Sequence, residues 1–428
     1  MDNYNAIVSE CLIKDESKSG KLDNLKFAIK DNISTKGVKT TGSSKILENY
    51  VPVFNATVID DIVNAGGEII AKAALDELGM GGYGTTAATG PVLNPLDTTR
   101  VAGGSSAGSA ALVASGYVHA SLGTDTGDSM RIPASYTGIV GFKPTYGRIS
   151  RFGVIPYAAS LDHVGIFAKD VKTTATILEV IAGYDENDQT SSYKAVEDYA
   201  SLDASLAGVK VGIIDNVIEH ISNEDILTAF NNLMSKLVEN DVQVENIQLN
   251  QDLFKALPTV YKVLTNAEAF SNHSNLNGVP FGNRQPGDNL NEIMLETRTK
   301  GLGYQVRARH LVGAYALMEE NYEGIYQKSK KVRRLIVEDL NDQLAKVDFL
   351  IAPSASRIAP KQDEDFYASS TYADNYMVMD NFSGHPGIVL PLGKSDGMPF
   401  GLYVSSKAFN EKQLLTLSNL IQEIVGEI

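Results

Sequence analysis

The chain has 428 residues, one cysteine at Cys11 and a formal net charge of −15 at pH 7. A single cysteine excludes an internal disulfide and a multi-cysteine zinc site, and it suits a reducing compartment. A chain this acidic does not by itself bind a nucleic acid tightly, because phosphate neutralisation supplies most of that affinity.

No apolar run approaches the roughly 18 residues that a membrane-spanning helix needs. The first residues, MDNYN, carry neither a basic n-region nor an Arg-rich amphipathic face, so no export or organelle signal is recognised. We therefore expect a cytoplasmic protein with no membrane contact.

The first elements alternate between strand and helix. Residues 1–23 are polar, and we expect a frayed lead-in or a short helix there. Residues 24–33 read as a buried strand that ends in a turn after Lys30. An amphipathic helix at 56–65 and a strand at 67–73 follow, an alternation that is typical of a sheet flanked by helices.

The second half of the chain also alternates between strands and helices. Residues 183–207 are polar and acidic, so we expect a surface excursion. A strand at 208–214, a helix at 223–238 and a strand at 242–247 predict one βαβ unit. We expect a loop at 275–289 and helical sequence at 304–345, whose basic run at 328–334 is a solvated face. Strands at 347–353, 387–391 and 400–404 and a closing helix at 411–425 follow.

The most unusual stretch holds two clusters of glycine and serine, which we call the first and second knots. The first knot is GGSSAGS at 103–109, and the second is GTDTGDS at 123–129. Glycine lets a backbone come close to another group, and loops on a rigid scaffold often carry chemistry. The small apolar residues at 110–114 favour a buried site over surface loops. We expect a strand at 117–122 and Ser129 at or near a helix start.

Two familiar motifs match by chance. Residues 104–108 fit G-x-S-x-G, but that nucleophile elbow needs a strand directly before it and a histidine partner. Residues 79–84 fit G-x-G-x-x-G, but a dinucleotide fingerprint must follow a strand directly and open a helix. Cys11 lacks the electropositive setting of a nucleophile, and no two of the six histidines have metal-ligand spacing.

Lysine is an alternative base for a serine nucleophile. It must be neutral, which requires burial or cationic neighbours to lower its pKa, and Lys30 at the end of a buried strand is the best candidate. A hydroxyl both donates and accepts, so a second serine could relay the proton between lysine and nucleophile. The backbone amides of Thr126, Gly127, Asp128 and Ser129 could form an oxyanion hole. A Ser-His-Asp triad, with His163 or His385 near the site, stays open.

These motifs resemble those of the amidase signature enzymes. That family carries a lysine in AIKDN, a cis-peptide serine in GGSS and a nucleophilic serine in G-T-D-x-G-x-S-x-R-x-P, which fall here on Lys30, Ser105 and Ser129. The intervals of 75 and 24 residues also fit the family. The similarity is dense over 24–165 and looser over 300–428.

The resemblance implies an α/β fold, with a large mixed β-sheet covered by helices on both faces. It implies one domain over 1–428, with a polar lead-in at 1–23, a catalytic core at 24–165, a more variable insert at 183–300 and a C-terminal part at 300–428 that completes the sheet and the substrate pocket. Lys30, Ser105 and Ser129 would be catalytic, and the chain would hold no metal or cofactor.

Within that family, the segments 28–33, 41–50, 143–148 and 160–162 are similar to those of the glutamine-hydrolysing subunits of tRNA-dependent amidotransferases. Such a glutaminase supplies ammonia that serves to convert Glu-tRNA(Gln), Asp-tRNA(Asn) or both. The resemblance implies that Arg309 binds the α-carboxylate of glutamine and Asp374 its α-amino group. Ser106 is a candidate for the same pocket because it adjoins Ser105.

The resemblance also implies partners. The B and C subunits would complete a heterotrimer, the tRNA would be held through the first of these two, and ATP and magnesium would bind at the partner. The acidic charge of this chain fits an arrangement in which a partner carries the tRNA.

The chain departs from the family at three points, and two alternatives stay open. Asp128 stands where the family usually has glycine, Ala107 stands where it often has glycine, and the lead-in before Lys30 is short. A carboxylate beside a developing oxyanion opposes it, unless Asp128 turns outward toward Arg131. The alternatives are a stand-alone amidase acting on another small amide and a non-catalytic scaffold subunit.

Overall fold

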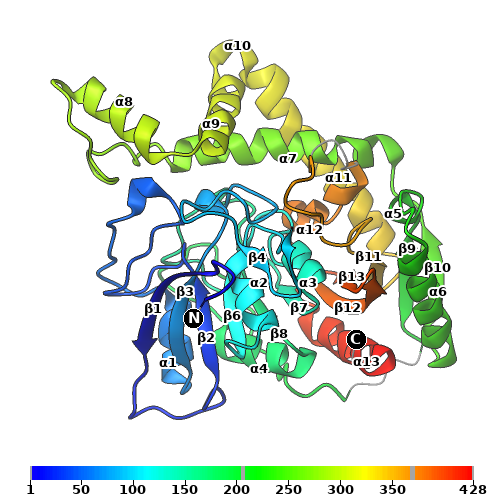
Figure 1. Ribbon diagram of the computed structural model, residues 1–428. Helices are drawn as coiled ribbons and strands as arrows, with labels where there is room; N and C mark the ends of the chain where they lie inside the picture. The colour runs from blue at the N-terminus through cyan, green and yellow to red at the C-terminus, as the bar shows by residue number, and fades with distance from the viewer. Residues whose placement is uncertain (1, 204–207, 367–371, 427–428) are drawn as a thin grey trace.

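The computed structural model describes residues 2–203, 208–366 and 372–426. Its described residues form one eleven-stranded sheet with the order β1-β3-β2-β6-β8-β7-β12-β13-β11-β9-β10 (Figure 1). The strands are β1 Ile7–Ile13, β2 Lys26–Lys30, β3 Glu68–Ala73, β6 Ala120–Asp125, β7 Val140–Lys143, β8 His163–Ala168, β9 Lys210–Ile214, β10 Gln243–Ile247, β11 Phe349–Pro353, β12 Gly387–Ser395 and β13 Met398–Ser406. Strands β4 Leu93–Asn94 and β5 Asp97–Val101 pair separately.

The sheet is mixed, as expected. Strands β3, β2 and β6 run parallel to one another, and so do β11, β9 and β10. The strands between these two groups pair antiparallel. The predicted βαβ unit is confirmed, because β9 and β10 are parallel neighbours joined through a helix.

Helices cover both faces of the sheet. One layer is a row in which each helix packs on the next: α1 Thr57–Asn64, α4 Val171–Ile181, α13 Glu411–Val425 and α6 Glu224–Glu239. The other layer contains α2 Ala107–Ala114 and α3 Arg131–Thr137, which pack on each other. The two sequence knots lead into α2 and α3, so the sheet and this layer together position them.

A group of helices extends this second layer. It lies above the sheet in Figure 1 and contains α7 Gln251–Asn272, α8 Leu290–Gly301, α9 Tyr304–Leu317, α10 Glu319–Asn321, the π-helix η3 Tyr322–Gln327, α11 Lys328–Leu344 and α12 Val378–Ser383. The short helices are η1 Lys45–Leu47, η2 Glu77–Gly79, α5 Asp215–Ile218 and η4 Tyr372–Asn375. In the described chain no helix has the length and apolar character of a membrane span.

Several expectations need correction. Residues 1–23 are not a frayed lead-in, because Ile7–Ile13 form the edge strand β1, which pairs antiparallel with β3. The strand expected at 117–122 lies three residues later, at 120–125. The basic run at 328–334 is not wholly solvated, because Arg333 turns inward and donates to the Phe382 carbonyl at 2.8 Å. Residues 204–207 of the acidic excursion lie outside the described residues.

The turn after β2 is fixed by a buried ion pair on the side away from Lys30. Asp31 Oδ1 lies 3.7 Å from Lys72 Nζ, and both side chains are buried. Asp31 Oδ2 accepts from the Thr41 backbone amide at 2.9 Å, and Lys72 donates to Thr40 Oγ1 at 2.9 Å. Removing one partner of such a pair leaves an uncompensated buried charge, so this pair holds the loop that follows Lys30.

Candidate active site

Lys30 occupies the carboxyl end of β2, beside the end of the parallel strand β6. Its side chain is fully buried. Its Nζ lies 2.9 Å from Ser105 Oγ and 2.8 Å from Ser106 Oγ. It also lies 2.8 Å from Thr124 Oγ1 and 3.1 Å from the Thr124 carbonyl oxygen. The structure therefore brings the first knot onto the predicted base.

One contact of the Lys30 amine has a fixed hydrogen-bond direction, the contact with Ser106. Ser106 Oγ donates to the Thr124 carbonyl at 3.0 Å, and a carbonyl only accepts. The Ser106 hydroxyl hydrogen is thus used, and this hydroxyl must accept from Lys30. As an ammonium, Lys30 donates to Ser105 as well, whereas a neutral amine has a lone pair that can accept the hydroxyl hydrogen of Ser105.

Burial lowers the pKa of Lys30 to about 7, although the charges of Asp125, Asp76 and Asp162 oppose the shift. The ordinary lysine pKa is near ~10.4, at which almost no amine is neutral at pH 7. A buried lysine whose pKa lies near the working pH has the protonation that a general base requires.

The first knot is shaped by contacts that only glycine allows. The peptide bond between Gly104 and Ser105 is cis, as the resemblance implies. A Cβ on Gly104 would lie 2.1 Å from Asp76 Oδ2 and 2.7 Å from the Gly84 backbone nitrogen. Asp76 also accepts from the backbone amides of Gly84 and Thr85 at 2.9 Å each. The glycines at 79–84 thus belong to a loop packed on the first knot, rather than to a dinucleotide site.

Ser129 lies in the turn between β6 and α3 and is 3% exposed. Arg131 Nη2 donates to the Gly127 carbonyl at 2.7 Å, and the Met130 amide donates to Asp125 Oδ2 at 2.9 Å. Asp125 and Arg131 form a buried ion pair at 2.9 Å, which fixes the turn. Across the described residues, the backbone amides of Thr126, Gly127 and Asp128 have no hydrogen-bond acceptor, so they are available to an oxyanion.

The two knots meet over β6. A Cβ on Gly123 would lie 2.5 Å from Met130 Sδ and 2.9 Å from Ser106 Oγ. Met130 directly follows Ser129, and Ser106 directly follows Ser105. The glycine at this position therefore allows both serine-bearing turns to approach the same strand.

Helices α7 and α9 bring two further side chains to the second knot. A Cβ on Gly127 would lie 2.8 Å from the hydroxyl oxygen of Tyr261, so this ring covers the turn. Arg309 Nη1 donates to the Tyr157 hydroxyl at 3.0 Å. Helix α9, which carries Arg309, packs on α7, which carries Tyr261. Burial raises the pKa of Tyr261, and the positive charge of Arg309 opposes the rise.

Asp128 is half-buried, and its carboxylate is not among the hydrogen-bond partners that the described residues give the Arg131 guanidinium. The Arg131 guanidinium instead binds Asp125, Asp380 and the Asn381 side-chain oxygen. Burial and the Asp125 charge raise the pKa of the Asp128 carboxyl to about 7, while Arg131 and Arg309 oppose the rise.

Asp374 lies in η4 and accepts from Ser356 Oγ at 2.6 Å. Burial raises the pKa of Tyr83, Arg357 opposes the rise, and the charges of Asp128 and Asp374 add to it. The charges of both carboxylates therefore act on the Tyr83 hydroxyl.

Ser106 has a different environment from the one expected. Its side chain is fully buried, and its hydroxyl contacts Lys30 and the Thr124 carbonyl. These contacts favour a role in orienting the lysine over a place in the substrate pocket. His163, a candidate for a histidine triad, contacts the Leu161 carbonyl through Nδ1 at 2.7 Å.

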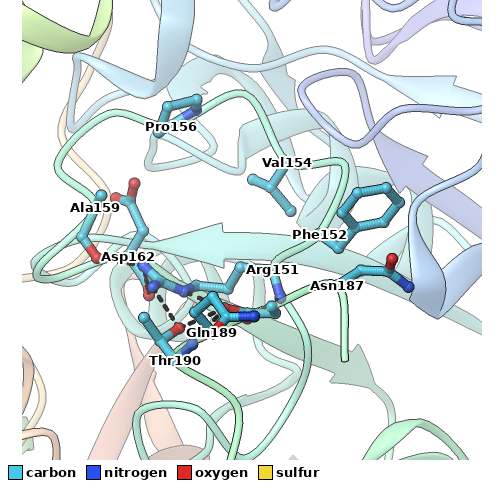
Figure 2. Close-up of a pocket in the computed structure, with 10 residues that line it drawn as sticks. Arg151, Phe152, Val154, Pro156, Ala159, Asp162, Asn187, Gln189 and Thr190 are labelled. Atoms are coloured by element: carbon cyan, nitrogen blue, oxygen red, sulfur yellow. Dashed lines mark hydrogen bonds and ion pairs between the residues drawn. The ribbon is translucent and has the colours of Figure 1, made fainter. Parts of the chain in front are cut away.

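A cavity of about 230 Å³ lies behind Asp162 (Figure 2). Figure 2 shows Phe152, Val154 and Pro156 around it, and Arg151 directed toward Thr190. The Asp162 carboxylate accepts from Thr126 Oγ1 at 2.6 Å, so it separates the cavity from the oxyanion turn. Within the described chain, no group of three or more His, Cys, Asp or Glu side chains could hold a metal ion.

Sequence reasoning missed three residues of this site. Thr124 contacts Lys30 through both its hydroxyl and its carbonyl oxygen, and its place in the second knot is the signal that could have found it. Asp76 holds the loop at 83–86 against the first knot, and a lone aspartate gives no signal. Tyr261 lies on α7, far from either knot in the sequence, and the packing of that helix reveals it.

Comparisons with known proteins find similarity over nearly the whole chain. A family model described as amidase matches residues 8–415. The A subunit of the glutamyl-tRNA(Gln) amidotransferase of Koribacter versatilis is 40% identical over 415 residues, covering 95% of this chain and 86% of that protein. Its counterpart from Thermotoga maritima is 37% identical over 407 residues, covering 95% and 85%.

Solved structures are also similar. The crystal structure of the same Thermotoga maritima protein has a TM-score of 0.82 and 34% identity, covering 98% of this chain and 87% of that one. A crystal structure of an amidase has a TM-score of 0.80 and 27% identity, covering 99% and 92%.

Proposed function

The chain belongs to the amidase family, and from this premise we propose that it is the glutamine-hydrolysing component of a glutamyl-tRNA(Gln) amidotransferase. The observation that carries the proposal is the contact of 2.9 Å between Lys30 Nζ and Ser105 Oγ in a fully buried setting. The similarity to the corresponding proteins of two bacteria extends over nearly the whole chain and supports the choice of glutamine over other amides.

In the proposed reaction, Ser129 is the nucleophile and Lys30 is the base. Ser129 passes its proton to Ser105, which passes its own proton to neutral Lys30. The Ser129 oxygen forms a bond to the glutamine carboxamide carbon, and the carbonyl π electrons move onto oxygen. Backbone amides of Thr126, Gly127 and Asp128 stabilise this oxyanion.

The tetrahedral intermediate then collapses. The carbon–nitrogen bond breaks, and the proton held by Lys30 returns through Ser105 to the departing nitrogen, so ammonia leaves. Water gives a proton through Ser105 to Lys30 and attacks the carbonyl carbon of the glutamyl-Ser129 ester. The bond from this carbon to Ser129 Oγ then breaks, the proton returns through Ser105 to Ser129 Oγ, and glutamate leaves. Each proton taken up by Lys30 is returned within the same half-reaction, so the enzyme ends unchanged.

The proposal assigns Arg309 to the glutamine α-carboxylate and Asp374 to the α-amino group. Charge-assisted contacts of this kind are shorter and stronger than neutral ones. Helix α9, which carries Arg309, packs on α7, whose Tyr261 covers the oxyanion turn. The role of Asp374 follows from the family resemblance alone.

The proposal also includes partners and location. The B and C subunits would complete a cytoplasmic heterotrimer in which ammonia from this chain amidates Glu-tRNA(Gln). The first of these partners would hold the tRNA together with ATP and magnesium. The net charge of −15 supports a partner-held tRNA, because a chain this acidic repels phosphates.

The test compares two nitrogen sources. The chain is assembled with candidate B and C subunits, and formation of Gln-tRNA(Gln) is measured with glutamine or with ammonium chloride. The wild-type complex should use both sources, whereas a complex with Ser129→Ala should use ammonium chloride only. Loss of both reactions in the variant, or retention of both, would contradict the proposal.

A further inference from the structure

Two buried histidines that the reaction does not use lie next to the proposed glutamine site. His310 directly follows Arg309 on α9, and His273 follows the last residue of α7. His273 is 1% exposed and His310 is 5% exposed. Their rings meet through a contact of 3.1 Å between His273 Nδ1 and His310 Nε2.

The groups at the two ends of this pair fix every hydrogen between them. His273 Nε2 lies 2.9 Å from the Pro156 carbonyl oxygen, which only accepts, so this nitrogen carries a hydrogen. Arg298 Nη2 lies 3.2 Å from His310 Nδ1, and arginine only donates. His310 Nδ1 therefore accepts, and His310 Nε2 donates to His273 Nδ1.

Both rings must be neutral for this sequence of hydrogen bonds. An extra proton on either ring would place a hydrogen against a donor. Burial lowers the pKa of His273 to about 4 and that of His310 to about 3, and the charge of Arg298 adds to both shifts. The three hydrogen bonds that link Arg298, His310, His273 and the Pro156 carbonyl are therefore all formed at neutral pH.

The residue after Pro156, Tyr157, joins this series of hydrogen bonds back to Arg309, the neighbour of His310, so the series forms a closed ring of contacts. Tyr157 is 4% exposed, and its hydroxyl accepts from Arg309 Nη1 at 3.0 Å. The same hydroxyl donates to Thr265 Oγ1 at 3.1 Å. The Arg309 backbone is therefore fixed through its neighbour His310, and its guanidinium is fixed by the Tyr157 hydroxyl. Both sets of hydrogen bonds lead to the segment Pro156–Tyr157.

We propose that His310 and His273 are positioning residues that fix Arg309 for recognition of the substrate α-carboxylate. The inference rests on the proposed function and deepens it, because it selects amides that carry an α-carboxylate. The histidines touch neither the substrate nor the reacting atoms. They act on the register of α9 relative to the Pro156–Tyr157 segment.

The test is His310→Phe, which keeps a planar ring and removes both hydrogen bonds of His310. The KM for glutamine should rise about tenfold, as expected for a weakened charge-assisted contact, while kcat stays within about twofold. The value of kcat/KM for butyramide, which has no α-carboxylate, should not change. His310→Gln, whose side-chain amide can still donate toward His273, should recover most of the lost affinity.

A merely structural role predicts another pattern. His310→Phe would then lower kcat/KM for glutamine and butyramide alike, and that result overturns the inference, as does an unchanged KM. If His310→Phe does not fold, Tyr157→Phe removes the hydroxyl at the other end of the ring and should produce the same selective rise in KM. An unchanged KM in Tyr157→Phe would also overturn the inference.

Arg309→Lys separates this inference from the proposed function. If the KM for glutamine rises in Arg309→Lys but not in His310→Phe or Tyr157→Phe, only the positioning role of the histidines is refuted. An unchanged KM in Arg309→Lys defeats the glutamine-binding role on which the inference rests.

Discussion

The ring of Tyr261 lies so close to Gly127 that a Cβ at that glycine would be 2.8 Å from the tyrosine hydroxyl oxygen. Gly127 belongs to the turn whose backbone amides precede Ser129, and its carbonyl accepts from Arg131. The turn is therefore held from both sides, by a helix that follows it in sequence and by a helix from a remote part of the chain.

Gly127→Ala should lower kcat for glutamine about 100- to 1,000-fold, the range for loss of an oxyanion-hole donor. The added methyl group must displace either the ring or the turn, and displacement of the turn misplaces the amides. The control is Gly324→Ala, because a Cβ at Gly324 has no neighbour within 4 Å. Equal activity of the two variants would show that the turn tolerates displacement.

The reaction should depend on a group that loses a proton near pH 7. The Lys30 amine must be neutral to accept a proton, and burial lowers its pKa to about 7. The rate should therefore rise with pH through about 7 on the acid limb of kcat/KM.

Asp162→Asn tests which group causes this acid limb. The Asp162 charge raises the pKa of Lys30, so its removal should move the midpoint to lower pH. The measurement is kcat/KM against pH for both proteins, and a midpoint that does not move would argue that another group titrates.

Asp128→Gly should increase turnover about two- to tenfold, because an ionised carboxylate next to the oxyanion opposes it. The gain should grow as pH rises through about 7, since the Asp128 carboxyl has a pKa of about 7 and ionises above it. Asp128→Asn, which is neutral at every pH, should show the same pH trend. Turnover that is unchanged or lower in Asp128→Gly would refute this account of Asp128.

Arg309→Lys should raise the KM for glutamine about 10- to 100-fold, because lysine cannot reproduce the forked contact of a guanidinium with a carboxylate. Arg307→Lys, a change of the same chemistry on the exposed face of the same helix, is the matched control. Steady-state ammonia release over a range of glutamine concentrations measures both. Equal KM values would remove Arg309 from the substrate site.

Sequence alone singles out the central residues of the candidate site but not the side chains around them. Lys30, Ser105 and Ser129 are recognisable because each sits in a local motif. Thr124 lies in the second knot, but its contact with Lys30 arises only when β6 lies beside β2. Tyr261 and the pair His273–His310 depend on how α7 and α9 pack, and no local pattern encodes that packing.

Some elements of the fold are likewise predictable from the sequence and others are not. The closing helix at 411–425 has a clear amphipathic period and matches the structure at both ends. The edge strand β1 was missed because it is covered on one side only, and Leu12 in it is 74% exposed. A half-exposed strand with charged and polar residues does not form the continuous apolar run that identifies a buried strand.

The most direct test of the account is ammonia release from glutamine by the purified chain, with and without candidate partner proteins, beside a Ser129→Ala control. We predict glutamine-specific release that rises with the partners and disappears in Ser129→Ala. Release from other small amides but not from glutamine would indicate a stand-alone amidase. Release that persists in Ser129→Ala, or no release under any condition, would contradict the assignment of Lys30, Ser105 and Ser129 as a glutaminase site.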